Sequence, residues 1–426
     1  MQTVTIPAGF DFTDPELYEK RLPHPEWAQL RKTEPIWWCA NEPGADGFDD
    51  HGYWVVTKHE DVKEISRRTN EVFSTFENTA IPRFAPGTER EIVELTRLLF
   101  INQDGDEHKK YRRTISKGFT PRNIEKMRDH LAEKARVIVE TAAAKGSGDF
   151  ITEVASELPL QAIAELIGIP LEDRHQIFEW SNQMTSYDVP GKVEESQIAN
   201  AMVLSYAQEL ATKRQTDPRD DLVTKLIQAD IDGEKLTADE FGWFVVLLAV
   251  AGNETTRNTT AWGMWALMQN PEQYAALAAD IDGKLDRATE EILRWATPVY
   301  HFRRTALADT EIAGQEIKKD DKVVIWHTSA DRDETVFDDP FRFDIERFPN
   351  DHIAFGGGGP HFCLGANLAR MELKLIFREI LERIPDMTLA AEPSILRSNF
   401  IGGIKHMPVT YSAGARKNPG PIPAKV

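Results

Sequence analysis

The sequence has little cysteine, with only Cys39 and Cys363 among 426 residues. A framework of several disulfides is therefore excluded, and so few cysteines are typical of a protein in a reducing compartment. Long apolar runs are also missing, since the most apolar stretch, residues 243–251, is far shorter than the roughly 20 residues of a membrane-spanning helix. Residues 1–10 lack the basic and apolar regions of a secretion signal. We therefore expect a soluble, cytoplasmic protein without a membrane span.

Basic residues are outnumbered, because 50 Lys and Arg against 69 Asp and Glu give a formal charge of −19. A nucleic-acid partner is not expected, since neutralising phosphates requires a basic surface. The 41% hydrophobic and 28% charged residues are ordinary for a globular chain that buries a large core. No linker-like segment or internal repeat divides the sequence. We expect one domain over residues 1–426, with an unordered tail at residues 416–426.

The residue pattern predicts a mainly α protein with small β-sheets at its margins. Charged and apolar residues recur at helical spacing from about Glu89 to Asn270. Strand-like runs occur at residues 35–38, 53–57, 299–326 and 387–411.

One predicted helix is unusually long and is interrupted by polar residues. It begins at a capping box formed by Thr237 and Glu240, and its pattern continues to Asn270. Its first half is apolar on every side, which predicts burial. Gly252 in its middle costs roughly 1 kcal/mol against alanine, and a buried Glu254 costs more unless it is paired. These costs favour a groove for a small ligand, although a simple helix kink remains an alternative.

A glycine-rich segment, FGGGGPHFCLG at residues 355–365, precedes another predicted helix. Consecutive glycines let a large flat group approach the backbone, and the helix start favours a thiolate at Cys363. A buried thiolate requires a positive partner such as a metal ion, although an inert core cysteine remains an alternative. Zinc and dinucleotide sites are disfavoured, because neither the zinc-ligand spacing nor a G-x-G-x-x-G after a strand is present.

Glu291 and Arg294 lie one helical turn apart, a spacing that alone indicates only a surface ion pair. Taken in order, however, the segments 251–256, 291–294 and 355–365 resemble the oxygen-activation helix, the E-x-x-R motif and the haem loop of the cytochrome P-450 superfamily. Two lesser matches are the H-x-x-x-R of residues 108–112 and the segment 337–347. One departure is that Phe355 precedes Cys363 by eight residues instead of the usual seven.

The resemblance implies a helical core that encloses haem b, used by a haem-thiolate monooxygenase. By it, Cys363 is the axial ligand of the haem iron. The other residues that it places at the cofactor are His108, Arg112, Arg304, His361, Phe355 and Gly252. Thr255 and Glu254 correspond to the catalytic pair that handles dioxygen and its protons. Glu291, Arg294 and Arg347 correspond to a buried structural triad.

A closer resemblance, carried by runs such as ELPLQAIAELIG and FVVLLAVAGNETTRN, is to the actinobacterial steroid C26/C27-monooxygenases. It implies hydroxylation, or further oxidation, of the terminal methyl of a sterol side chain, as in cholesterol or cholest-4-en-3-one. Counting back from Glu254 along one helix face predicts an apolar distal wall. The expected substrate-binding residues are Ile81, Phe84, Trp243, Leu247, Val250, Ala251, Val299 and Phe400.

Other readings remain open: the same chemistry on a branched fatty acid, another lipid or a terpenoid, a non-catalytic haem sensor or carrier, or a structural metal protein. No flavin or iron–sulfur motif occurs in the sequence, so the electrons must come from a separate protein. The implied partners are a ferredoxin and its NAD(P)H-dependent reductase. Their candidate contacts are Lys109, Lys110, Arg113 and Lys117.

Overall fold

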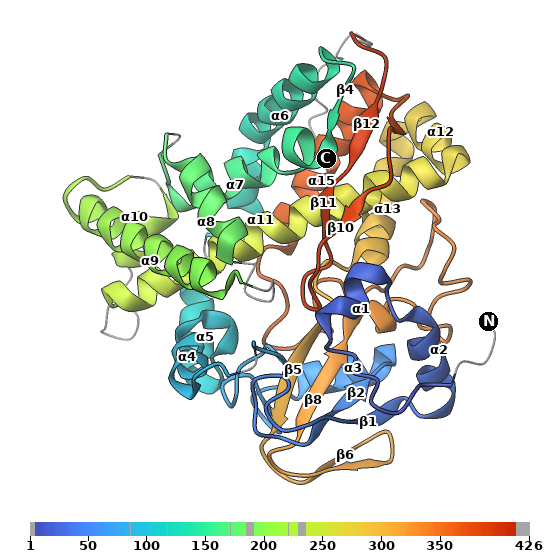
Figure 1. Ribbon diagram of the computed structural model, residues 1–426. Coiled ribbons are helices and arrows are strands. Elements are labelled where there is room, and N and C mark those ends of the chain that lie inside the picture. Colours follow the sequence, from blue (N-terminus) through green and yellow to red (C-terminus); the bar gives the residue numbers. More distant parts are fainter. Residues whose placement is uncertain are drawn as a thin grey trace.

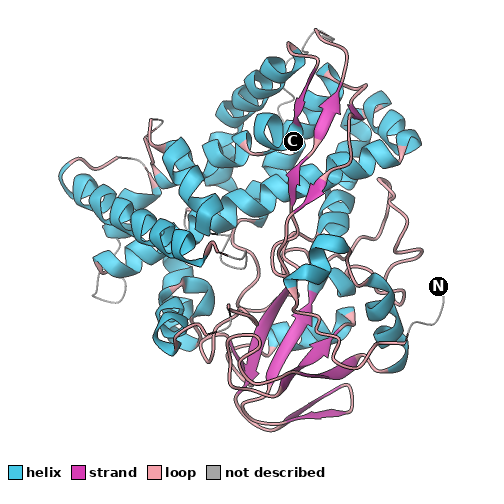
Figure 2. Cartoon of the chain, in the orientation of Figure 1, coloured by secondary structure: helices cyan, strands magenta, loops and turns pink. Residues whose placement is uncertain are grey.

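The computed structural model describes residues 5–85, 87–116, 118–170, 172–184, 191–219, 221–228 and 236–414. Helices make up most of the described chain, and strands gather in a β-rich part and in smaller sheets (Figure 1 and Figure 2). The predicted mainly α fold is therefore confirmed. The single domain over residues 1–426 stays a prediction, and the expected tail at residues 416–426 lies outside the described residues.

The helices follow the chain in this order: α1 (Pro15–Lys20), α2 (His24–Thr33), α3 (His59–Arg67), α4 (Arg90–Leu95), α5 (Gly105–Ile115), α6 (Pro121–Ala143), α7 (Glu157–Ile167), α8 (Arg174–Met184), α9 (Val193–Thr216), α10 (Leu222–Ile227), α11 (Ala238–Gln269), α12 (Pro271–Ala279), α13 (Ile281–Ala296), α14 (His327–Ala330) and α15 (Ala366–Arg383). Short 3₁₀ segments are η1 (Thr96–Leu98) and η2 (Phe100–Asn102), and η3 (Ile151–Ala155) is a π-helix.

The strands are β1 (Ile36–Ala40), β2 (Gly52–Val56), β3 (Phe73–Ser74), β4 (Ser147–Asp149), β5 (His301–Ala306), β6 (Thr310–Ile312), β7 (Gln315–Ile317), β8 (Lys322–Trp326), β9 (Thr388–Leu389), β10 (Ser394–Ile395), β11 (Ile404–His406) and β12 (Pro408–Thr410). The predicted strand-like runs are all represented among them.

The main sheet has the strand order β1-β2-β8-β5-β3. Its neighbours are antiparallel except β2 and β8, which run parallel with Val55 opposite Val324. Every residue of β8 is buried, as its run of β-branched and aromatic side chains predicts. In β5, Arg304 lies opposite Val323, so the sheet fixes the position of an arginine near the molecular interior.

Helix α11 crosses the helical part of the molecule (Figure 1). Thr237 and Glu240 form the predicted capping box, and the helix stays unbroken through residues 251–256. Helix α7 packs closely against this segment, because a Cβ at Gly252 would lie 2.6 Å from the Cδ1 of Ile163. None of the helices in the described ranges, α11 included, is long and apolar enough to cross a membrane.

Candidate active site

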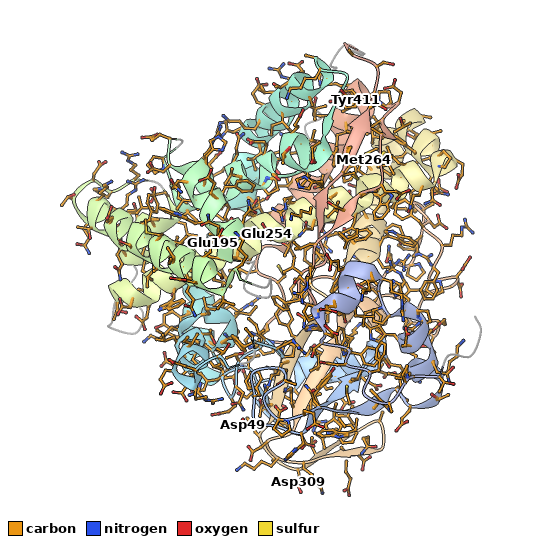
Figure 3. The ribbon with its side chains drawn as sticks, viewed as in Figure 1. Asp49, Glu195, Glu254, Met264, Asp309 and Tyr411 are labelled. Atoms are coloured by element: carbon orange, nitrogen blue, oxygen red, sulfur yellow. The ribbon has the colours of Figure 1, made fainter. Side chains whose placement is uncertain are left out.

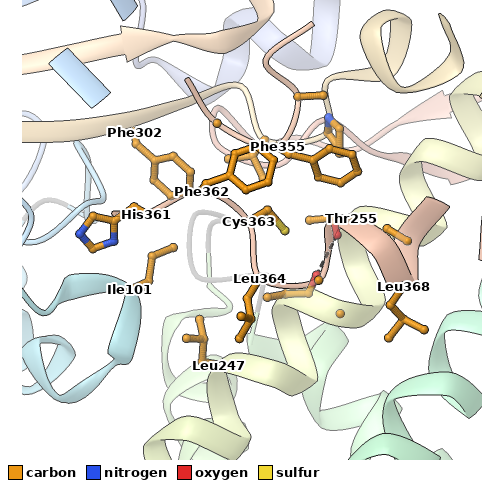
Figure 4. A pocket seen from close by; sticks show the side chains of 18 of the residues that line it. Ile101, Leu247, Thr255, Phe302, Phe355, His361, Phe362, Cys363, Leu364 and Leu368 are labelled. Carbon is orange, nitrogen blue, oxygen red and sulfur yellow. Dashed lines mark hydrogen bonds between the residues drawn. The ribbon is translucent and has the colours of Figure 1, made fainter. Parts of the chain in front are cut away.

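A cavity of about 240 Å³ lies between α11, the main sheet and the glycine-rich loop (Figure 4). Cys363 projects into it from the loop, and Thr255 projects into it from α11. The structure thus brings together residues that are far apart in the sequence. The predicted site residues that line the cavity are Cys363, His108, Arg112, Arg304, His361, Phe355, Gly252, Thr255, Leu247, Ala251 and Val299.

The glycine-rich loop packs on α3 more closely than a side chain would allow. Gly359 has a φ of +75°, and a Cβ there would lie 2.3 Å from the backbone oxygen of Ser66. The loop returns so that the Cys363 N–H donates to the Phe355 oxygen at 2.9 Å. The extra residue between Phe355 and Cys363 is therefore accommodated by the glycines, and the Phe355 ring still lines the cavity beside the thiol.

The Cys363 thiol is surrounded by protein but exposed to the cavity. Burial raises its pKa, although a hydrogen bond from the Gly365 backbone and the charges of Arg112 and Arg370 partly oppose this shift. A thiolate at this position would therefore gain from a bound cation. The donor chemistry of Cys363 fits the iron of the haem that the sequence leads us to expect.

One end of the cavity gathers histidine and arginine side chains. The rings of His108 and His361 stack with their centroids 4.2 Å apart, and neither nitrogen of His108 has a hydrogen-bond partner among the described residues. Burial, with the nearby His361 and Arg112, lowers the pKa of His108 to about 3. His361 Nε2 lies 3.7 Å from an Asp104 carboxylate oxygen. Burial alone would raise the Asp104 pKa, but hydrogen bonds from the side chains of His361, Ser74 and Thr75 lower it.

Two guanidinium groups complete this end of the cavity. Arg304 donates to Thr69 Oγ1 at 3.0 Å and to the Arg303 oxygen at 2.8 Å, and burial lowers its pKa to about 10. Arg112 donates to the Phe362 oxygen at 2.6 Å. Neither forms an ion pair with a carboxylate of the described chain. Two unpaired cations and an unpartnered imidazole fit the two propionates of haem, whose burial requires such partners.

On α11, Thr255 and Glu254 face different surroundings. The Thr255 hydroxyl lies at the cavity and donates to the Ala251 oxygen at 2.7 Å. Glu254, labelled in Figure 3, does not line the cavity: it is fully buried and its Oε2 is bound by Arg257. Burial raises the pKa of Glu254 despite this ion pair, and its Oε1 has no hydrogen-bond partner among the described residues.

Several expected substrate-binding residues do not line the cavity. Trp243 and Val250 pack on the hydrophobic core, and Phe84 contacts Phe48 edge to face at 5.7 Å. The ring centroid of Phe400 lies 5.5 Å from that of Phe302, and Phe302 does line the cavity. Ile81 is also absent from the wall, although its neighbour Ala80 belongs to it.

The cavity wall includes residues that the sequence reasoning missed. Phe302 precedes Arg304 by two residues on β5, and the alternation of a strand could have identified it. Phe244 and Leu248 lie at helical spacing before Ala251 and Thr255, so the correct face of α11 could have been counted from Thr255. His327 and Glu372 are also buried in the wall, but no sequence signal marked them.

The predicted structural triad of Glu291, Arg294 and Arg347 forms a buried cluster. Glu291 accepts from Arg294 at 2.7 and 2.8 Å and from Arg347 Nε at 3.1 Å, and the side chains of Glu291 and Arg294 are completely buried. Arg294 also donates to the backbone oxygens of Asp331 and Pro340 at 2.8 and 2.9 Å. The cluster ties α13 to the segment that precedes the glycine-rich loop.

The cavity is lined both by a cysteine and by cationic side chains suited to propionates. Together with the fold, this lining defines the class of haem-thiolate enzymes. A profile of the family described as Cytochrome P450 matches residues 160–385. The chain belongs to the cytochrome P450 family, and it is a monooxygenase whose cofactor is iron protoporphyrin IX.

Known relatives agree over almost the whole chain. A steroid C26-monooxygenase of Rhodococcus jostii (strain RHA1) is 52% identical over 96% of this chain and 86% of its own length. A methyl-branched lipid omega-hydroxylase of Mycobacterium bovis (strain ATCC BAA-935 / AF2122/97) is 39% identical over 91% of this chain and 90% of its own. The solved structure of Mycobacterium marinum cytochrome P450 CYP268A2 with pseudoionone has a TM-score of 0.88 and 35% identity, covering 96% of this chain and 99% of that one.

Proposed function

We propose that the enzyme hydroxylates the terminal C26/C27 methyl of a sterol side chain such as that of cholest-4-en-3-one. Dioxygen, two electrons and two protons convert a C–H bond into C–OH and leave one water. The observation that carries the proposal is the apolar α11 wall beside Cys363, formed by Leu247, Ala251 and their neighbours. The 52% identity to a steroid C26-monooxygenase supports this substrate class.

Cys363 is the residue that would hold the haem iron, with Phe355 and Gly252 lining the same cavity. When bound there, haem supplies the iron chemistry that activates dioxygen, and thiolate donation favours O–O cleavage. His108, Arg112, Arg304 and His361 would bind its propionates. These roles are supported by the unpartnered nitrogens of His108 and by the absence of carboxylate partners for both arginines among the described residues.

Thr255 and Glu254 are the proposed catalytic pair. The Thr255 hydroxyl holds a proton at the cavity, where it can donate to an oxygen of the reacting molecule. Glu254 has one carboxylate oxygen bound by Arg257 and one free of hydrogen bonds among the described residues, which supports Oε1 as the atom that takes up and releases a proton. Glu291, Arg294 and Arg347 are assigned to stability and haem retention.

Substrate contacts are proposed first for Leu247, Ala251 and Val299, which line the cavity. Apolar burial there stabilises an alkyl chain by roughly 25 cal/mol per Å². Contacts are also proposed for the remaining predicted residues, which do not line the cavity: Ile81, Phe84, Trp243, Val250 and Phe400.

Optical titration of the ferric enzyme tests the substrate class. We expect cholest-4-en-3-one to shift the spin state of the haem-loaded enzyme at lower concentration than branched fatty acids or terpenes. The 39% identity to a methyl-branched lipid omega-hydroxylase makes a branched lipid the second candidate. Tighter binding of that lipid would overturn the sterol proposal.

A ferredoxin and its NAD(P)H-dependent reductase are the proposed electron donors. Helix α5 carries His108 and Arg112 at the cavity, so its outer residues Lys109, Lys110 and Arg113 are candidate contacts, whereas Lys117 lies outside the described residues. Charge reversal at Lys109 and Lys110 should slow reduction in a salt-dependent manner. A cytoplasmic location is also proposed, which the low cysteine content supports.

A further inference from the structure

Helices α13 and α15 are joined by a ladder of ion pairs whose members are spaced four residues apart. Its rungs are Glu290–Arg370, Asp286–Lys374 and Asp282–Arg378, with nitrogen–oxygen distances of 2.7, 2.6 and 2.6 Å. A spacing of four residues places the members of each helix on one face. Ion pairs between two helices normally only stabilise their packing. The pair whose surroundings differ from the others is therefore the candidate for a further role.

The Glu290–Arg370 rung differs from the other two in its surroundings. The Arg370 guanidinium carbon lies 4.5 Å from the centroid of the Phe355 ring, which lines the cavity beside Cys363. The Glu290 side chain is 30% exposed, against 78% for Asp286 and for Asp282. The Arg370 side chain is itself 30% exposed, against 17% for Lys374 and 13% for Arg378. The first ion pair is therefore set apart by the contact of its cation with Phe355 in the cavity wall, because a charge acts more strongly at a shorter distance.

Glu290 is held by three hydrogen bonds from two side chains, Arg370 and His352. Arg370 donates from Nε and Nη2 to the two carboxylate oxygens at 2.7 and 2.8 Å, and His352 Nε2 lies 2.9 Å from Oε2. Burial alone would raise the Glu290 pKa, but these hydrogen bonds lower it to about 2. Glu290 is therefore ionised at neutral pH.

His352 is the second partner of Glu290. Its Nδ1 accepts the Ala354 N–H at 3.3 Å, so Nε2 is the ring nitrogen that donates to Glu290. The cation of Arg370 and the anion of Glu290 balance each other. The Arg370 guanidinium carbon lies 4.5 Å from the centroid of the Phe355 ring, and the His352 ring centroid lies 6.0 Å from it. Removing either charge leaves the other unbalanced next to the cofactor cavity.

We propose that Arg370, counterbalanced by Glu290, is a positioning residue that sets the reduction potential of the haem held by Cys363. When an external donor adds one electron, the haem–thiolate unit becomes more negative by one charge. The cation behind Phe355 stabilises this reduced form, and the carboxylate of Glu290 limits that effect. The inference rests on the proposed ligation by Cys363.

The test is spectroelectrochemical titration of the haem-loaded protein. Glu290→Gln keeps the size of the side chain and should raise the potential, whereas Arg370→Gln should lower it. We expect the ferrous-to-ferric ratio at a fixed applied potential to change about threefold or more, in opposite directions. The double variant and Arg370→Lys, which retains the cation, should lie near the wild type.

Asp286→Asn and Lys374→Gln are matched controls, because they make the same charge changes about 6 Å further along α15. They should leave the potential nearly unchanged. Equal shifts in the controls, or shifts of one sign in Glu290→Gln and Arg370→Gln, would overturn the inference. The ferrous carbonyl spectrum of each sample separates the two claims: an intact thiolate band with unmoved potentials contradicts only the role of Arg370, whereas loss of that band in the wild type contradicts the ligation itself.

Discussion

Glu254 and Arg257 form an ion pair one helical turn apart on α11, and Arg257 also donates to the Asn182 amide oxygen of α8 at 2.8 Å. Thr255 lies between them in sequence but faces the cavity. The acid and the hydroxyl therefore do not meet directly, and a proton passing between them requires intervening water or a rotation of Glu254 away from Arg257.

Glu254→Gln removes the acid while keeping its shape. We expect product formation to slow about 100-fold, because general acid catalysis contributes at least this factor. The spectral shift on binding substrate should stay unchanged, since Glu254 does not line the cavity. Glu372→Gln provides the control, because Glu372 is a buried carboxyl in the cavity wall and burial also raises its pKa. Slow turnover in the Glu372 variant alone would show that the acid has been misassigned.

Thr255→Ala removes the hydroxyl at the cavity. Electron uptake should continue, but a larger share of the electrons should leave as hydrogen peroxide instead of appearing in product. Thr260→Ala is a matched control, because Thr260 makes the same type of bond to a backbone oxygen on α11, at 2.9 Å, without lining the cavity. Parallel assays of NAD(P)H, peroxide and product measure the coupling. Equal coupling in wild type and Thr255→Ala would remove this threonine from the mechanism.

His301 predicts an acid-dependent loss of stability. The residue is fully buried against Trp326, with ring centroids 4.3 Å apart, and burial lowers its pKa to about 3. The unfolded chain binds a proton at this residue near pH 6.5, so between these values the unfolded state holds more protons and the free energy of unfolding falls as the pH falls. At pH 5 this residue should cost the wild type about 2 kcal/mol relative to pH 7.5.

His301→Leu should lose about 2 kcal/mol less than the wild type over the same pH interval, because leucine does not titrate. Urea unfolding at pH 7.5 and pH 5 measures the difference. His327, whose pKa burial also lowers to about 3, remains in both proteins and cancels in the comparison. Parallel losses in the two proteins would contradict the assignment.

Local sequence signals predicted most of the fold. The capping box at Thr237, the strand run before Trp326 and the break at the glycine-rich loop each mark an element that the structure contains. These signals are reliable because they depend on neighbouring residues. The strand order of the main sheet depends instead on contacts between distant segments, such as β2 beside β8, which a single sequence does not encode locally.

The site was predictable where motifs carry it and less so along its apolar wall. Counting the wall from Glu254 selected Leu247, which lines the cavity, but also Trp243 and Val250, which pack on the core. Counting from Thr255 gives Ala251 and Leu248, both in the wall. One helical step of 100° thus separates a core residue from a wall residue, and apolar composition does not distinguish them.

The central claim is that haem iron is bound by the sulfur of Cys363, and the ferrous carbonyl spectrum tests it most directly. The wild type and Cys39→Ser should both show the red-shifted band of a thiolate ligand, because Cys39 is buried elsewhere and burial raises its pKa to about 11. Cys363→His should bind haem without that band. A red-shifted band that survives in Cys363→His, or a wild type that lacks it, would contradict the account.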